Sequence, residues 1–83
     1  MFEMKYIIIK TPMGEKPYIF SNLDNHNEVA NSLRYGHDNV VGAGFLQHTA
    51  EGMRVYGRSE SLDVNNRGDA DNRIINRFFR IDL

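Results

Sequence analysis

The sequence predicts an α+β fold, in which a four-stranded, mostly antiparallel sheet carries two helices on one face in the order β-β-α-β-β-α. Met4–Lys10 and Asn39–Thr49 are apolar runs of the kind that forms buried strands. Two other segments place apolar side chains at helical spacing, and Gly, Asn and Pro residues separate the elements. With 83 residues and about 100–200 residues per domain as the usual range, one domain over residues 1–83 is expected.

The first two strands are expected to form a hairpin. Lys5–Lys10 is rich in β-branched and aromatic residues, and its apolar positions Tyr6–Ile9 indicate burial on both faces, which is typical of a central strand. Met13–Pro17 contains Gly and Pro and predicts a turn. Tyr18–Phe20 is then the returning strand.

A short helix is predicted over Asn25–Tyr35. Asn25 is a suitable N-cap, and Glu28 follows at the spacing of a capping box. Gly36 stands where a left-handed residue often ends a helix. The apolar face of this helix comprises Val29, Ala30 and Leu33.

The third and fourth strands are predicted at Val40–Thr49 and Met53–Tyr56, with a tight turn between them. Strict alternation along the third strand puts Val41, Ala43, Phe45 and Gln47 on one face. The other face then carries Val40, Gly42, Gly44, Leu46 and His48. Glycines inside a strand indicate a close approach by another element, and a helix pressed against this face is the expected cause.

A polar loop over Gly57–Asn66 leads to the last helix, Asp69–Phe79. Its apolar stripe is expected to dock on the sheet and consists of Ile74, Ile75, Phe78 and Phe79. If the Phe78 ring is fully buried, its replacement by Ala should cost roughly 3–5 kcal/mol. The adjacent flank carries Arg73, Arg77 and Arg80.

Composition excludes several classes of protein and site. The net charge of −1 lacks the basic excess of a typical nucleic-acid binder, and the absence of Cys excludes disulfides and Cys-based zinc sites. The longest uninterrupted aliphatic run, Ile7–Ile9, is far shorter than the ~20 residues that span a bilayer. No His has a second His at the spacing of a metal motif. We therefore expect a cytosolic chain with no membrane or nucleic-acid partner, no metal and no cofactor.

The segment Gly57–Ser61 is the strongest candidate for a binding site. Arg58 offers a planar fork for a phosphate or carboxylate, while Ser59 and Ser61 add hydroxyl donors. Beside them, Tyr56 can present its ring edge or hydroxyl, and Arg73 and Arg77 of the last helix extend the positive surface if the helix starts near the loop. The alternative is structural: the two serines bond to their own backbone, and Arg58 pairs with an internal carboxylate such as Asp63 or Asp71. No catalytic residue is predicted, because no nucleophile motif is present.

The string Tyr56-Gly57-Arg58-Ser59-Glu60-Ser61-Leu62, with Met4–Ile7 and Val41–Phe45, resembles short, poorly characterised proteins of phages, prophages and bacterial chromosomes. The resemblance implies a phage-related origin and carries no activity. Some members have a Cys before the Tyr, where this chain has Val55. With Met4 as the family-like start, residues 1–3 are expected to be an N-terminal extension.

Four functions stay open at this level. The first is a binding protein without catalysis that engages a host protein, and the second is a nucleotide or anion-binding module that uses the Arg58-Ser59 loop. A small hydrolase or transferase and a phage structural component are the remaining alternatives. A homodimer is expected, because a core of this size is marginal on its own and a short sheet leaves edges that a second copy can pair.

Overall fold

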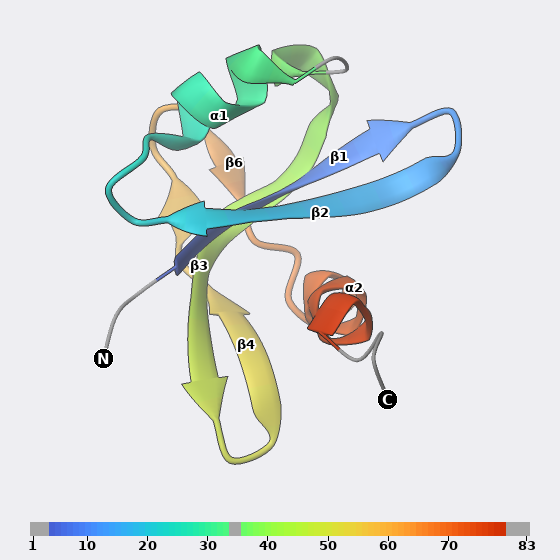
Figure 1. Ribbon diagram of the computed structural model, residues 1–83, viewed down its shortest axis with the longest axis vertical. Helices are drawn as coiled ribbons and strands as arrows, with labels where there is room; N and C mark the ends of the chain where they lie inside the picture. The colour runs from blue at the N-terminus through green and yellow to red at the C-terminus, as the bar shows by residue number, and fades with distance from the viewer. Residues whose placement is uncertain (1–3, 34–35, 80–83) are drawn as a thin grey trace.

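The structure, a computed structural model, describes residues 4–33 and 36–79 and confirms the α+β fold with a four-stranded antiparallel sheet (Figure 1). The strand order is β2-β1-β3-β4, and β5 and β6 form a separate small hairpin. In chain order the elements are β1 (Met4–Thr11), β2 (Gly14–Ser21), α1 (His26–Ser32), the 3₁₀ turn η1 (His37–Asn39), β3 (Val40–Thr49), β4 (Gly52–Tyr56), β5 (Arg58–Ser59), β6 (Val64–Asn65) and α2 (Asp69–Phe79).

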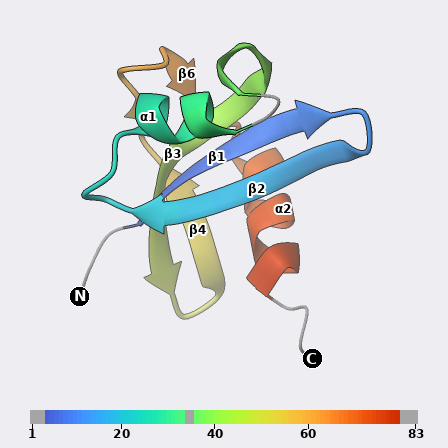
Figure 2. The ribbon, with the colours of Figure 1, turned by 45° about the horizontal axis from the view of Figure 1, so that its top comes forward.

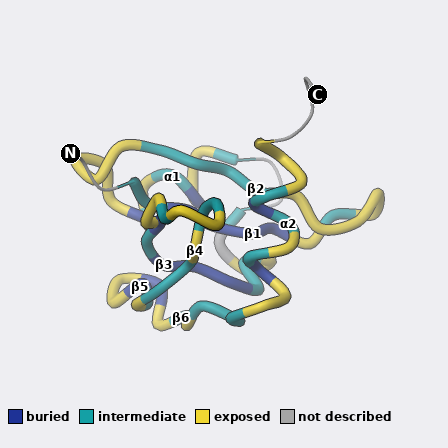
Figure 3. Tube along the Cα trace, turned by 90° about the horizontal axis from the view of Figure 1, so that it is seen from below, coloured by how far each residue is buried: buried dark blue, intermediate teal, exposed yellow. Residues whose placement is uncertain are grey.

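The central position of β1 is confirmed. It pairs with β2 along one side and with β3 along the other, both antiparallel. Ile7 and Ile8 are completely buried, and Figure 3 shows β1 and β3 as the buried centre of the molecule. Both faces of this strand therefore lie in the core.

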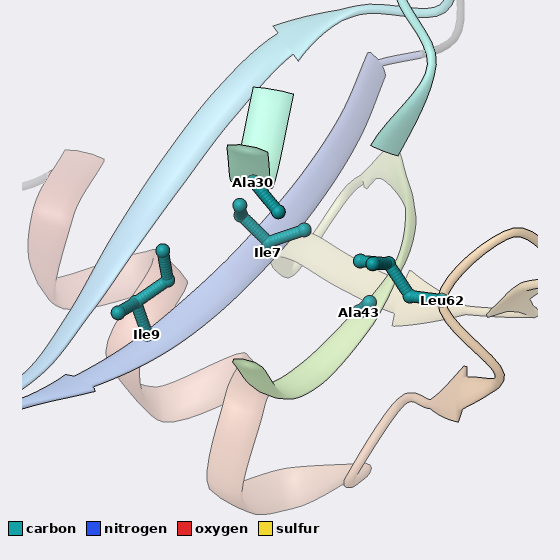
Figure 4. Close-up of a cluster of buried hydrophobic side chains, with 5 residues drawn as sticks. All are labelled: Ile7, Ile9, Ala30, Ala43 and Leu62. Carbon is teal, nitrogen blue, oxygen red and sulfur yellow. The ribbon is translucent and has the colours of Figure 1, made fainter. Parts of the chain in front are cut away.

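The two helices lie on opposite faces of the sheet, so the prediction that both cover one face is wrong. Successive side chains of a strand point to opposite faces. Ile7 packs with Ala30 of α1 (Figure 4), whereas Ile8 packs with Ile75 of α2. Figure 2 shows α1 and α2 on either side of the β1–β2 hairpin. The physical reason is the continuous apolar run itself, because a strand that is apolar on both faces needs cover on both.

The first hairpin is longer than expected, and the predicted turn over Met13–Pro17 is wrong. The chain turns at residues 12–13 only, and β2 already begins at Gly14 with a φ of 117°. Pro17 lies within β2, opposite Ile8. An edge strand tolerates proline because the missing N–H can face outward, away from the ladder.

A β-bulge changes the predicted faces of β3. The register with β1 shifts between Ile8 and Ile9, so Val40 packs in the α1-side core and Val41 in the α2-side core. The strict alternation assumed from the sequence is therefore wrong at this end of β3. A bulge adds one residue to one strand and locally changes its facing.

Helix α1 begins close to the predicted residue and ends earlier. The Asn25 side chain accepts a hydrogen bond from the Asn27 amide at 2.8 Å, which confirms the cap. The helix ends at Ser32, where Leu33 is extended, so the end predicted at Tyr35 is wrong; residues 34–35 themselves lie outside the described part. The segment expected to be a loop, Gly57–Asn66, contains the β5–β6 hairpin.

The predicted bounds of α2 are confirmed, but its docking stripe is partly wrong. Ile75 is buried and Ile74 packs beside it, while Phe78 and Phe79 are 44% and 43% exposed. The premise of a fully buried Phe78 therefore fails. The helix instead turns a polar stripe towards the sheet, with Asp71 fully buried.

Two asparagines of α2, Asn72 and Asn76, cover the free edge of β4 with hydrogen bonds. Asn76 accepts a hydrogen bond from the Met53 amide at 3.0 Å and donates one to the Met53 carbonyl at 2.9 Å. Asn72 accepts one from the Val55 amide at 2.7 Å. Residues four apart share one helix face, so the two amide side chains act on β4 as a partial fifth strand. Within residues 4–33 and 36–79, neither helix is long and apolar enough to cross a bilayer.

Candidate functional site

A pocket of about 280 Å³ opens on the α1 side of the sheet, where four distant segments of the chain meet. Lys5 of β1 and Phe45 of β3 lie opposite each other in the sheet register. The start of α1 and the β5–β6 hairpin complete the walls. The lining residues are Lys5, Asn25, His26, Phe45, Arg58, Glu60 and Ser61.

Aromatic rings form one side of this site. His26 lies edge-on between Phe20 and Phe45, with ring centroids 5.5 Å and 5.7 Å away. Phe45 in turn stacks on Tyr56 at 5.6 Å. Edge-to-face and offset-stacked pairs of this kind are the favoured aromatic arrangements. They hold Phe45 in place as a flat apolar surface in the pocket.

His26 is a buried polar residue, with only 4% of its surface exposed. Its Nε2 lies 2.8 Å from the Gly44 carbonyl oxygen. Because a carbonyl only accepts, Nε2 carries a proton and donates it. Burial lowers the pKa of His26 below its ordinary value, with a smaller contribution from Lys5, while the bond to Gly44 opposes the shift.

The guanidinium of Arg58 is already engaged by its own hairpin. It bonds to Glu60 at 2.8 Å, to Asp63, and through Nε to Asn65 at 2.9 Å. The hydrogen bonds with Asp63 and Glu60 raise the pKa of Arg58. This is the pairing that the structural interpretation of Arg58 expects. Both carboxylates are highly exposed, and exposed ion pairs of this kind contribute little stability.

The two serines have different environments. Ser59 is fully buried, and its hydroxyl accepts a hydrogen bond from the Leu62 amide at 3.1 Å. It therefore shapes the turn of the hairpin and does not face a ligand. Ser61 is exposed and donates to Asn25 Oδ1 at 3.0 Å, which links the hairpin to the cap of α1.

The remaining predicted site residues lie away from the pocket. Tyr56 stands behind Phe45 and supports its ring. Arg73 and Arg77 are exposed on α2, across the sheet from α1. Of the six predicted residues, the pocket thus brings together Arg58 and Ser61.

Sequence reasoning missed Lys5, Asn25, His26 and Phe45 as site residues. Asn25 lies at the predicted start of a helix and Phe45 within a predicted strand, but no local pattern links them to Lys5 or His26. The four positions become neighbours only through sheet pairing and helix docking. No group of three or more His, Cys, Asp or Glu side chains that could hold a metal ion occurs among the described residues.

A second polar cluster lies on the α2 side and is part of the core. The fully buried Asp71 carboxylate accepts from the Tyr6 hydroxyl at 2.6 Å and from Arg67 Nε at 2.8 Å. Arg67 also pairs with Glu15 of β2 at 2.8 Å. Burial, followed by the bond to Asp71, raises the pKa of Tyr6 well above its ordinary value. Since its groups satisfy one another, this cluster ties β1, β2 and α2 together.

The chain matches no protein-family model, no curated protein and no solved structure.

Proposed function

We propose that this protein is a small binding module whose pocket holds a small anionic ligand. The observation that carries the proposal is the pocket itself, in which a lysine and an arginine stand beside an exposed part of an aromatic ring. Ligand sites typically combine an apolar wall with a few polar groups and occupy about 300–1,000 Å³. A volume of about 280 Å³ lies just below that range and therefore suits a small ligand.

Lys5 is the main positive contact in this proposal. Its ammonium donates one hydrogen bond, to the Asp24 carbonyl at 2.7 Å, and an ammonium group has three protons to donate. Arg58 adds positive charge, but its fork is held by Glu60 and Asp63. This assigns the leading role to Lys5 in place of Arg58.

Binding is favoured over catalysis by the partners of the pocket groups. A hydrolytic nucleophile needs a base within hydrogen-bond reach. Ser61 donates to Asn25 Oδ1, and His26 donates to the Gly44 carbonyl. Among the described residues no hydroxyl is hydrogen-bonded to His26, so the pocket holds no paired nucleophile and base.

Calorimetric titration with phenylacetate and its neutral amide, phenylacetamide, tests the proposal. Phenylacetate should bind more tightly, because only it carries a charge for Lys5. A charge-assisted hydrogen bond contributes about 1.5–3 kcal/mol, so Lys5→Gln should weaken phenylacetate binding more than tenfold. Lys16→Gln, at an exposed position of β2, is the matched control and should bind normally. Equal affinity for the acid and the amide would refute the anion pocket.

Arg58→Gln separates the two interpretations of that arginine. If it acts mainly within the hairpin, the variant should bind phenylacetate about as tightly as the wild type and melt only slightly earlier, since exposed ion pairs contribute little stability. A variant of normal stability that no longer binds would return the leading role to Arg58.

Contact with a host protein is a second candidate, favoured by the two half-exposed rings at the end of α2. Phe78 and Phe79 meet edge-to-face at 5.5 Å and are 44% and 43% exposed. Aromatic side chains are enriched at protein interfaces. Capture of one defined host protein by the wild type, and its loss in the double variant Phe78→Ser and Phe79→Ser, would support this role. Capture by both proteins would exclude these rings as the contact.

A further inference from the structure

The pocket contains a hydrogen-bond acceptor as well as cations. His26 Nε2 is protonated, because it donates to the Gly44 carbonyl. Burial lowers the pKa of the ring, so the neutral form is the stable one at neutral pH. In a neutral imidazole with a proton on Nε2, Nδ1 has a lone pair and accepts hydrogen bonds.

The second ring nitrogen of His26, Nδ1, has no hydrogen-bond partner among the described residues. Every fully buried side-chain nitrogen or oxygen of the described part has a partner. Nδ1 is therefore not sealed in the core. His26 is 96% buried and is a lining residue of the pocket, and from these two facts we infer that Nδ1 is reached from the pocket.

The charges around the pocket limit the charge of the ligand. Lys5 and Arg58 are the lining cations, and Glu60 is a lining carboxylate. Asp63 is a second carboxylate held against the Arg58 guanidinium. Arg58 is thus neutralised by two carboxylates, and Lys5 is the lining cation that no described carboxylate pairs with. Its single positive charge suits one negative charge better than the two of a phosphate monoester.

We propose that the ligand is a small monoanion with an N–H or O–H group next to its charge, such as a 2-hydroxy carboxylate. This inference rests on the proposed anion pocket. The carboxylate contacts Lys5, the neighbouring hydroxyl donates to His26 Nδ1, and an apolar part of the ligand lies on Phe45. Each of these contacts uses a group that the fold leaves accessible in one pocket.

The test compares mandelate with phenylacetate, which differs from it by lacking the 2-hydroxyl. Mandelate should bind about fivefold to tenfold more tightly, since one net hydrogen bond contributes roughly 1 kcal/mol. In His26→Phe, which keeps a ring between Phe20 and Phe45, the preference should disappear. If that variant does not fold, the ¹⁵N resonance of Nδ1 in the wild type provides the readout: mandelate should shift it upfield, and phenylacetate should not.

The outcomes separate this inference from the proposed function. Equal binding of mandelate and phenylacetate, both tighter than phenylacetamide, would overturn the donor requirement and leave the anion pocket standing. Tighter binding of phenyl phosphate than of mandelate would overturn the monoanion preference. No advantage of either acid over the amide would refute the pocket and this inference together.

Discussion

Two buried side chains, Asp71 and His26, show how individual residues are accommodated in this core. Asp71 is fully buried, and the Tyr6 hydroxyl, the Arg67 side chain and the Arg67 amide all donate to its carboxylate. A buried charge is tolerated when it is paired and hydrogen-bonded. Gly42 faces this carboxylate so closely that an added Cβ would overlap it. The close approach predicted at the glycines of β3 is therefore confirmed at Gly42, where α2 supplies the contact.

His26 predicts a pH dependence of stability. Its folded pKa lies below the ordinary value of 6.5, so between these two values the unfolded chain binds more protons than the folded chain. The free energy of unfolding should then be highest above about pH 6.5 and decrease as the pH falls below it. Thermal melts between pH 5 and 8 measure this effect.

The matched variants assign this slope to one residue. His26→Gln should flatten the profile between pH 5 and 6.5, whereas His48→Gln, at an exposed position, should keep the wild-type profile. The lowered pKa of Glu15, whose ordinary value is 4.5, acts in the same direction only at lower pH. A wild-type slope that persists in His26→Gln would contradict the assignment.

At the scale of elements, α2 contacts β4 through both apolar packing and hydrogen bonds. It buries Ile75 against the α2-side core, and its asparagines satisfy the outward-facing groups of the strand. An exposed strand edge is a template for pairing with another chain. On β4, side chains of α2 already bind the backbone groups at Met53 and Val55 that another strand would otherwise pair with.

Asn76→Ala should destabilise the protein by about 1–2 kcal/mol, because it removes both bonds to the Met53 backbone. For a domain of this size, 1 kcal/mol lowers the melting temperature by roughly 4–8 °C. Amide hydrogen exchange at Met53 should become faster in the variant. Asn31→Ala is the control, since Asn31 is exposed on α1 and its side chain lies 3.5 Å from Asn27 Oδ1, at the limit of a hydrogen bond. Unchanged melting and exchange in Asn76→Ala would mean that the edge is held without this side chain.

At the scale of the whole molecule, the edges of the sheet decide how a second copy could pair with it. The sheet has two outer strands, β2 and β4. β4 is hydrogen-bonded to α2 through Met53 and Val55, and β2 contains Pro17, which cannot donate from its backbone. Both outer strands are therefore less suited to pairing with a second copy than free strand edges would be. This weakens edge pairing as the basis for the predicted dimer.

The homodimer stays a prediction, and light scattering at micromolar concentration tests it. A dimer should have about twice the chain mass of 9.6 kDa. If the contact is the Phe78–Phe79 surface, the double serine variant should have the mass of one chain. A wild-type mass near 9.6 kDa would exclude the dimer.

Local pattern was sufficient to predict the elements with strong periodicity. Val40–Thr49 and Asp69–Phe79 have the predicted bounds, because apolar runs and helical stripes are properties of neighbouring residues. The cap at Asn25 was predictable for the same reason. The predicted length of β2 was too short, because Gly14 and Pro17 suggest a turn. Only the edge position of the strand, which the sequence does not show, explains why they are tolerated there.

The sequence alone determined the α+β class, the central place of β1 and the order of the main elements, because these depend on composition and spacing along the chain. Only the tertiary structure decided which faces the helices cover, which edge α2 seals and which residues form the pocket. Lys5, His26, Phe45 and Arg58 are separated by roughly 10 to 20 residues each along the chain and meet through strand pairing and helix docking. Contacts of that kind depend on the register and the packing of whole elements, and no local pattern encodes them.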